Sequence, residues 1–148
     1  MNEKFTDESD PVFDMGIGLR HKIKEWLNKN NFKNCIINDD LTITSYSAIE
    51  LTTLSLIDGK LPDFIQFNIV YEEFGANDIE LISLKGFPYE IRAKGNYWGN
   101  LWIYDNKLIT LKYLPKIIEG RFACGKNDEI FSIEYIKSLS KIGRDITN

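Results

Sequence analysis

A short segment near the middle of the chain gathers aromatic and basic residues. Arg92, Lys94, Tyr97 and Trp98 lie close together, and Trp102 follows. Tyr, Trp and Arg are the residues that most often anchor protein interfaces, because they bury a large area at a small entropic cost. We therefore expect Tyr97 and Trp98 to be exposed residues that contact a protein partner.

The strand expected around Trp102 has two faces. Leu101 and Ile103 alternate with Trp102 and Tyr104, so one of these pairs belongs to the core and the other to the surface. The alternation alone does not say which pair is which.

The same segment has a second interpretation, namely a nucleic-acid-binding accessory protein. Bases would stack on the aromatic rings, while Arg92, Lys94 and Lys107 would pair with phosphates. A salt titration separates the two hypotheses, because phosphate contacts lose affinity steeply as salt rises and aromatic anchors do not.

Charge is segregated along the chain, although the formal net charge is only -4. Lys60 is the only cation among residues 38–80, a stretch that is otherwise rich in Asp and Glu. This acidic stretch argues against nucleic-acid binding. It could instead steer a basic partner such as a nuclease, with Glu72 and Glu73 as candidate contacts. The competing interpretation is an ordinary solvated face.

Residues for catalysis or cofactor binding are scarce, so we expect no enzyme, no cofactor, no metal site and no small-molecule substrate. His21 is the only histidine, and it falls on the polar side of an expected helix. Cys35 and Cys124 are too few for a zinc site and are typical of small apolar core residues. The sequence contains no nucleophile motif, phosphate-binding glycine loop or metal motif.

The chain repeats itself. Residues 81–88 read Leu-Ile-Ser-Leu-Lys-Gly-Phe-Pro, and residues 108–115, 27 positions later, read Leu-Ile-Thr-Leu-Lys-Tyr-Leu-Pro. β-rich stretches and Asn-bearing turns recur with these segments, as at 117–124 and 125–128. One such unit cannot bury its own apolar side, so stacked copies must share a core. The asparagines are expected to bond the backbone groups that the turns leave open.

Elements at both ends are expected to close this array. Apolar residues at positions 19, 23, 26 and 27 predict a helix that begins near Asp14 and ends in the Asn-rich stretch 28–31. Residues 35–37 and 41–44 flank a turn and predict a hairpin. Ser132 is a good N-cap, and Phe131 and Ile136 suit a hydrophobic staple, so a C-terminal helix should cover the last repeat.

These features resemble leucine-rich-repeat-like proteins of bacteriophages and prophage-bearing bacteria, over roughly residues 17–140. The closest matches are 81–88, 106–115 and the Gly-x-Phe-x-Cys turn at 120–124. The family repeat is nearer 20 residues, so the longer period here implies an insertion, most visibly Arg92 to Gly99. The resemblance implies a binding scaffold. By analogy with phage proteins, it implies an inhibitor of a host defence protein, such as an anti-CRISPR that blocks a host nuclease or its nucleic-acid complex.

We therefore predict an α+β fold in which residues 14–148 form a single domain. This domain would be a short leucine-rich-repeat-like β-solenoid or curved sheet of about three solenoid strands plus the hairpin, with an N-terminal helix and a C-terminal capping helix. Residues 1–13 lack apolar periodicity and predict a flexible acidic tail. The acidic start and the short apolar runs predict a cytoplasmic protein without a membrane partner.

Overall fold

The structure, a computed structural model, describes residues 11–148, with the backbone alone for residues 11–17. The predicted acidic tail therefore lies outside the described residues up to position 10. The elements in chain order are α1 (Pro11–Lys29), β1 (Cys35–Ile37), β2 (Ile43–Ser45), β3 (Ile49–Glu50), the 3-10 turn η1 (Thr53–Ser55), β4 (Phe67–Tyr71), β5 (Glu73–Gly75), β6 (Glu90–Arg92), β7 (Asn100–Trp102), β8 (Ile117–Ile118), β9 (Phe122–Ala123), α2 (Ile133–Leu139), β10 (Lys141–Ile142) and β11 (Ile146–Thr147).

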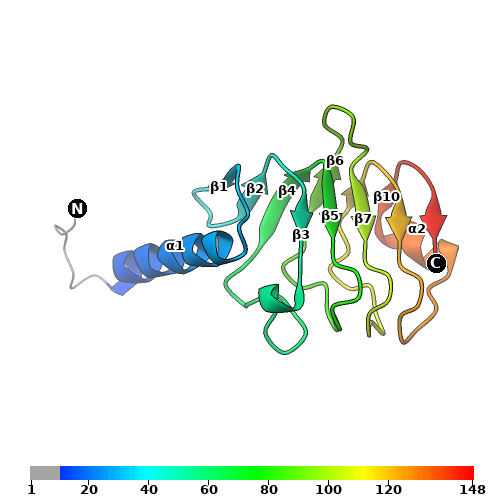
Figure 1. The fold of residues 1–148 in the computed structure, drawn as a ribbon, viewed down its shortest axis with the longest axis horizontal. Coiled ribbons are helices and arrows are strands. Elements are labelled where there is room, and N and C mark those ends of the chain that lie inside the picture. Colours follow the sequence, from blue (N-terminus) through cyan, green and yellow to red (C-terminus); the bar gives the residue numbers. More distant parts are fainter. Residues whose placement is uncertain (1–10) are drawn as a thin grey trace.

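The strands wind into a β-solenoid of about four turns (Figure 1). One sheet has the order β1-β2-β4-β6-β8-β10, and the other has the order β11-β9-β7-β5-β3. Each coil contributes one strand to each sheet, and neighbouring coils pair in parallel. The exception is β1, which pairs antiparallel with β2 and forms the predicted hairpin. The solenoid is thus confirmed, but it has two sheets where one curved sheet was predicted.

A corner in each coil divides the predicted β-rich stretches between the two sheets. The stretch 117–124 becomes β8 and β9 because the chain turns at Gly120. A Cβ atom on Gly120 would lie 2.8 Å from the carbonyl oxygen of Trp98, so only glycine lets this corner stack on the previous one. In the coil of β4 and β5 the corner is Glu72 alone, with φ of 84°. Hydrophobicity does not reveal such corners, which explains the wrong number of sheets.

Strand register explains the period of the repeat. Val70 pairs with Ile91, and Leu101 pairs with Phe122, each across 21 positions. Ile91 pairs with Ile118 across 27 positions, and this interval contains the segment 93–99. Coils without this segment span 21 to 25 residues, as between Val70 and Ile91 and between Ile49 and Phe74, and the predicted insertion lengthens the coil that contains it.

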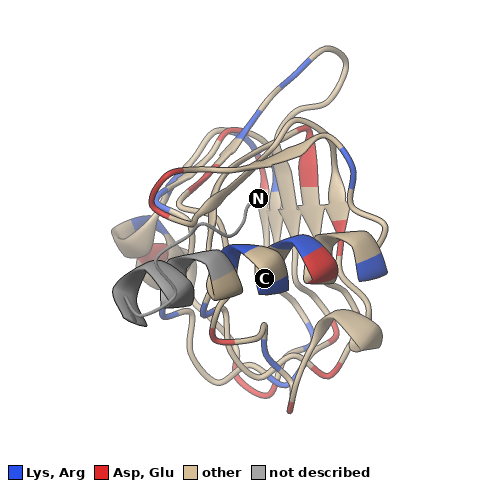
Figure 2. Ribbon diagram, turned by 90° about the vertical axis from the view of Figure 1, so that its left-hand side faces the viewer, with Lys and Arg blue, Asp and Glu red and all other residues tan. Residues whose placement is uncertain are grey.

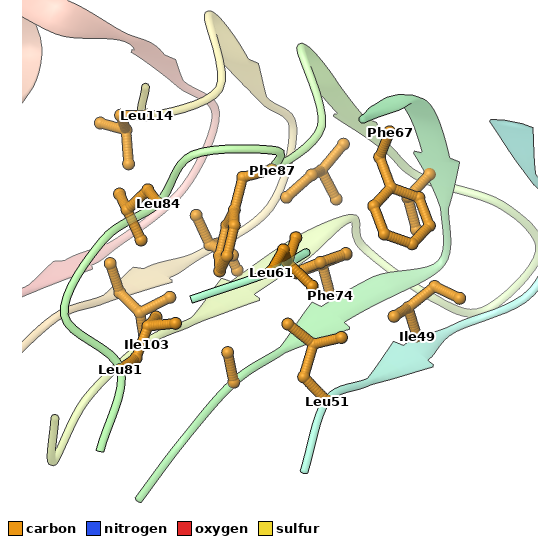
Figure 3. Packing of buried hydrophobic residues seen from close by; sticks show 14 of the residues in the cluster. Ile49, Leu51, Leu61, Phe67, Phe74, Leu81, Leu84, Phe87, Ile103 and Leu114 are labelled. Carbon is orange, nitrogen blue, oxygen red and sulfur yellow. The ribbon is translucent and has the colours of Figure 1, made fainter. Parts of the chain in front are cut away.

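The two sheets and the repeated leucines enclose a single apolar core (Figure 3). Leu84 and Leu111, which occupy equivalent repeat positions, are 1% and 0% exposed. The aromatic rings of Phe67 and Phe74 meet across the sheets with centroids 5.4 Å apart. The predicted stacking of leucines from successive repeats is confirmed.

Buried asparagines tie the turns of successive coils together. The Asn106 side-chain oxygen accepts the backbone N–H groups of Ile79 and Leu81, both at 3.0 Å. Its amide nitrogen donates to the carbonyls of Ala76 and Ile103 at 2.6 and 3.1 Å. One side chain thus satisfies four backbone groups in two coils, as the repeat predicts.

Helix α1 lies across the N-terminal end of the solenoid (Figure 2). Ile23, Trp26 and Leu27 are buried against the core, and the Trp26 indole donates to the carbonyl of Ser55 at 3.2 Å. The helix begins at Pro11 rather than at Asp14, since proline needs no N–H partner in a first turn. No helix in the described part of the chain is long and apolar enough to cross a membrane.

Helix α2 begins after Ser132, whose side chain accepts the N–H of Tyr135, as predicted. Phe131 and Ile136 are buried in the core. The helix does not form the end of the solenoid, however, because β10 and β11 follow it and pair with β8 and β9. It is instead a part of the last coil.

Candidate interaction surface

The insertion forms a hairpin at the corner between β6 and β7. The backbones of Lys94 and Tyr97 exchange two hydrogen bonds of 3.0 Å, and Gly95 adopts a left-handed φ of 60° at the tip. The hairpin projects beyond the two sheets, at the top of Figure 1 and again in Figure 2, where its basic segments are blue. The predicted insertion is therefore a surface loop.

Lys94 attaches one side of this hairpin to the preceding coils. Its ammonium lies 3.8 Å from a carboxylate oxygen of Glu72 and donates to the carbonyl of Tyr46. The other carboxylate oxygen of Glu72 accepts the N–H of Ala48 at 3.1 Å. Only 19% of the Glu72 side chain is exposed. Both Lys94 and Glu72 thus hold the hairpin in place.

Trp98 attaches the other side to the following coils. The guanidinium carbon atoms of Arg121 and Arg144 lie 4.6 and 3.9 Å from the centroid of its ring. Such distances are typical of cation–π contacts. Trp98 nevertheless keeps 39% of its surface exposed, and Tyr97 keeps 51%. The two aromatic residues expected at the surface are exposed, on a hairpin that is attached at both sides.

Arg92 lies at the base of the hairpin within an ion-pair network. Its guanidinium donates to Glu90 at 2.9 Å and to Glu119 at 2.8 Å. Glu119 also accepts the N–H of Ala93 at 2.7 Å. This backbone hydrogen bond, together with the Arg92 charge, holds the pKa of Glu119 below its usual range, although partial desolvation opposes the shift. The network keeps Arg92 occupied and positions the first residue of the hairpin.

A pocket of about 450 Å³ opens between the hairpin and the last two coils. Its lining comes from the base and rim of the hairpin, from β8 and from the corner after β10. The lining residues are Arg92, Ala93, Trp98, Ile117, Ile118, Glu119, Lys141, Gly143 and Arg144. The pocket therefore combines apolar surface with several cations.

Glu73 and Trp102 lie away from this pocket, on the outer face of the second sheet. Trp102 is in register with Gly75, and Glu73 with Asn100. Leu101 lies on the inner face of the same strand and is fully buried, so Trp102 belongs to the surface pair. The structure thus places the seven candidate residues at three locations: the hairpin corner, the outer face of the first sheet at Arg92, and the outer face of the second sheet.

Glu50 is the acidic neighbour of Glu73 on that outer face. Burial, and then the charge of Glu73, raise the pKa of Glu50. Its carboxylate occupies the space above Gly75, where a Cβ would lie 2.3 Å from a carboxylate oxygen. Glu73 is thus close enough for its charge to act on Glu50, a relationship that the sequence does not reveal.

The sequence interpretation missed Arg121, Arg144 and Lys141. A signal for the two arginines was present, because the dipeptides Gly120-Arg121 and Gly143-Arg144 both occupy coil corners. Recognising them requires knowing where each coil turns, and the repeat motif alone does not mark these positions.

The histidine and the two cysteines lie outside the lining of this pocket. His21 is exposed on α1 and lies 3.4 Å from Glu25, one helical turn away. Cys124 is buried in the core, whereas Cys35 is half-buried. Within residues 18–148, no three His, Cys, Asp or Glu side chains come together as a metal site would require.

Comparisons with protein-family models, with curated proteins and with solved structures gave no match to this chain. The geometry of the hairpin corner is therefore the basis on which a function can be argued.

Proposed function

We propose that this protein is a non-enzymatic binding module that contacts a protein partner through the hairpin corner. The observation that carries the proposal is the exposure of Tyr97 and Trp98 on a hairpin fixed at both sides. Aromatic anchors that are held in place before binding lose little entropy when the partner arrives. A loop that departs from a regular solenoid is also where such scaffolds often carry their binding residues.

The resemblance to leucine-rich-repeat-like phage proteins supports a more specific form of this proposal. In that form the chain is a phage-type inhibitor, anti-CRISPR-like, which acts in the bacterial cytoplasm on a host defence protein such as a nuclease. Coils without the hairpin span 21 to 25 residues by strand register, which is nearer to the shorter repeat of that family than the 27-residue period is. The scaffold by itself does not determine the partner.

A capture experiment with matched tyrosine variants tests the proposal. The tagged full chain is used to isolate partners from the source cell and its host, and mass spectrometry identifies them. Tyr97→Ala, alone and combined with Trp98→Ala, is compared with Tyr89→Ala, because Tyr89 is 50% exposed and lies outside the hairpin. Tyr97→Ala together with Trp98→Ala should weaken binding of the captured partner by about 2 kcal/mol or more, whereas Tyr89→Ala should not.

A charge variant on the second sheet provides the competing test. Glu73→Lys is suitable because Glu73 lies on the outer face, whereas Glu72→Lys would also release the hairpin. If Glu73→Lys abolishes binding and the aromatic pair does not, the contact surface is the acidic face instead. A steep loss of affinity with salt would favour the nucleic-acid alternative.

A further inference from the structure

The pocket beside Trp98 has cations that no carboxylate of residues 18–148 neutralises. Arg92 is engaged by Glu90 and Glu119, and Arg121 lies 3.5 Å from Asp145. Among residues 18–148, no carboxylate lies within 4.0 Å of the side-chain nitrogens of Lys141 or Arg144. Both are exposed and both line the pocket. The rim of the pocket thus has two positive charges without a carboxylate partner in the described part of the chain.

The contact with Trp98 holds the Arg144 guanidinium in a position where it can bind an anionic ligand. A guanidinium 3.9 Å from the ring centroid is held by the aromatic face, which makes no hydrogen bond with its N–H groups. Arg144 donates no side-chain hydrogen bond to any described residue, so these N–H groups remain available. A planar guanidinium presents such groups in the geometry that a carboxylate accepts with both oxygens.

The other lining residues of the pocket favour a ligand that carries an apolar group beside its anionic group. Ile117 is half-buried on the outer face of β8, and Ala93 and Trp98 also line the pocket. Glu119 is part of the lining, but Arg92 and the Ala93 N–H already occupy its oxygens. A ligand that carries a carboxylate next to an aliphatic side chain would complement both features.

We infer that this pocket binds an acidic peptide segment of the protein partner, with a carboxylate on Arg144 and Lys141 and an adjacent apolar side chain against Trp98 and Ile117. The inference rests on the proposed function, because it names the chemistry of the segment that the hairpin corner holds. Two cations that lack a described carboxylate partner match one or two carboxylates of a ligand. A nucleic-acid backbone, in contrast, presents a long row of phosphates and needs a correspondingly long row of cations.

The test is a titration of the full chain with short probes, followed by NMR of the Trp98 indole N–H and the Gly143 amide. The acidic probe is acetyl-Leu-Glu-Leu-Glu-amide, and the neutral probe is acetyl-Leu-Gln-Leu-Gln-amide. Arg144→Gln removes the charge at the rim, and Lys137→Gln on α2 removes an exposed charge elsewhere. Circular dichroism of each variant confirms that it is folded.

The acidic probe should shift both signals and bind about tenfold more tightly than the neutral probe, because hydrogen bonds to charged groups contribute more than neutral ones. Arg144→Gln should remove most of this preference, and Lys137→Gln should leave it unchanged. Equal binding of the two probes, or an acidic preference that survives Arg144→Gln, overturns the inference. An oligothymidine of about eight nucleotides that shifts the same two signals and binds more tightly than the acidic probe also overturns it.

The two proposals fail separately. If the partner is lost in the Tyr97 and Trp98 variant but the acidic probe does not bind, the proposed function stands and the acidic-peptide inference is wrong. If the probe binds through Arg144 but partner capture is insensitive to the aromatic pair, the proposed function is wrong and the pocket remains an anion site.

Discussion

The guanidinium of Arg144 lies 3.9 Å from the centre of the Trp98 ring, although these residues belong to different coils. Strand register places them near each other, because β7 pairs with β9 and β9 pairs with β11. The solenoid thus brings residues of the hairpin and of the last coil to one corner. The same stacking that builds the core also assembles the candidate surface.

The ion pair between Lys94 and Glu72 gives the first prediction. Glu72→Gln keeps the acceptor for Ala48 but removes the charge that attracts Lys94. Partial opening of the hairpin should then make cleavage by trypsin after Lys94 about two- to fivefold faster, as expected for losing a surface ion pair. Peptide mapping of the native protein over time measures this rate. Glu73→Gln is the control, and equal rates in both variants would contradict the proposed attachment.

The repeated leucines give a prediction about stability. Leu84→Ala and Leu111→Ala should each lower the free energy of unfolding by roughly 2–5 kcal/mol, because each leaves a cavity in the core. Ile109 is 69% exposed on the same segment, so Ile109→Ala serves as the control and should change little. Urea unfolding measures all three. If neither leucine variant lowers the free energy of unfolding, the leucines are not stacked in a core.

Asn106 gives a second and independent test of the stacking. Asn106→Ala removes the partners of Ile79, Leu81, Ala76 and Ile103 and should cost about 1–3 kcal/mol through the unsatisfied buried groups. Asn77 accepts the N–H of Tyr104 at an exposed position, so Asn77→Ala should cost less. Thermal unfolding of both variants provides the comparison. An equal loss in both would show that burial of the asparagine does not matter.

The local elements could be predicted from the sequence because their signals are local. Helix α1, the β1–β2 hairpin and the Ser132 cap follow from periodicity and turn chemistry within a few residues. The two sheets could not be predicted, because each corner depends on a close approach between coils, as at Gly120. For the same reason the hairpin residues were found as a cluster, whereas Arg121 and Arg144, which come from later coils, were missed.

Cys124 gives a prediction about thiol reactivity. Burial raises the pKa of this thiol to about 11, and burial also raises the pKa of Cys35. The reactive thiolate is therefore scarce in the folded protein at pH 8. A thiol reagent should label Cys124 only slowly until denaturant unfolds the chain, whereupon both cysteines should react. Ellman's reagent measures this difference in the wild type and in Cys35→Ser. Fast native labelling in Cys35→Ser would contradict the burial of Cys124.

Glu119 and Glu50 predict opposite effects of pH on stability. The pKa of Glu119 is lowered in the folded state, so its contribution is present above the pKa of the unfolded chain and is lost as pH falls through the folded value. The pKa of Glu50 is raised, so its contribution is present below the unfolded value and is lost as pH rises through the folded value.

Glutamine variants of these two residues test the opposite signs at pH 7 and at pH 3. Glu119→Gln should lower the melting temperature at pH 7 by about 1–4 °C, since the residue is partly exposed and its ion pair is screened. Glu50→Gln should raise the melting temperature at pH 7, because a neutral amide avoids the repulsion from Glu73. Both differences should shrink at pH 3, where the wild-type carboxyl groups become protonated. A loss of stability in both variants at pH 7 would show that Glu50 contributes through packing on Gly75 rather than through its charge.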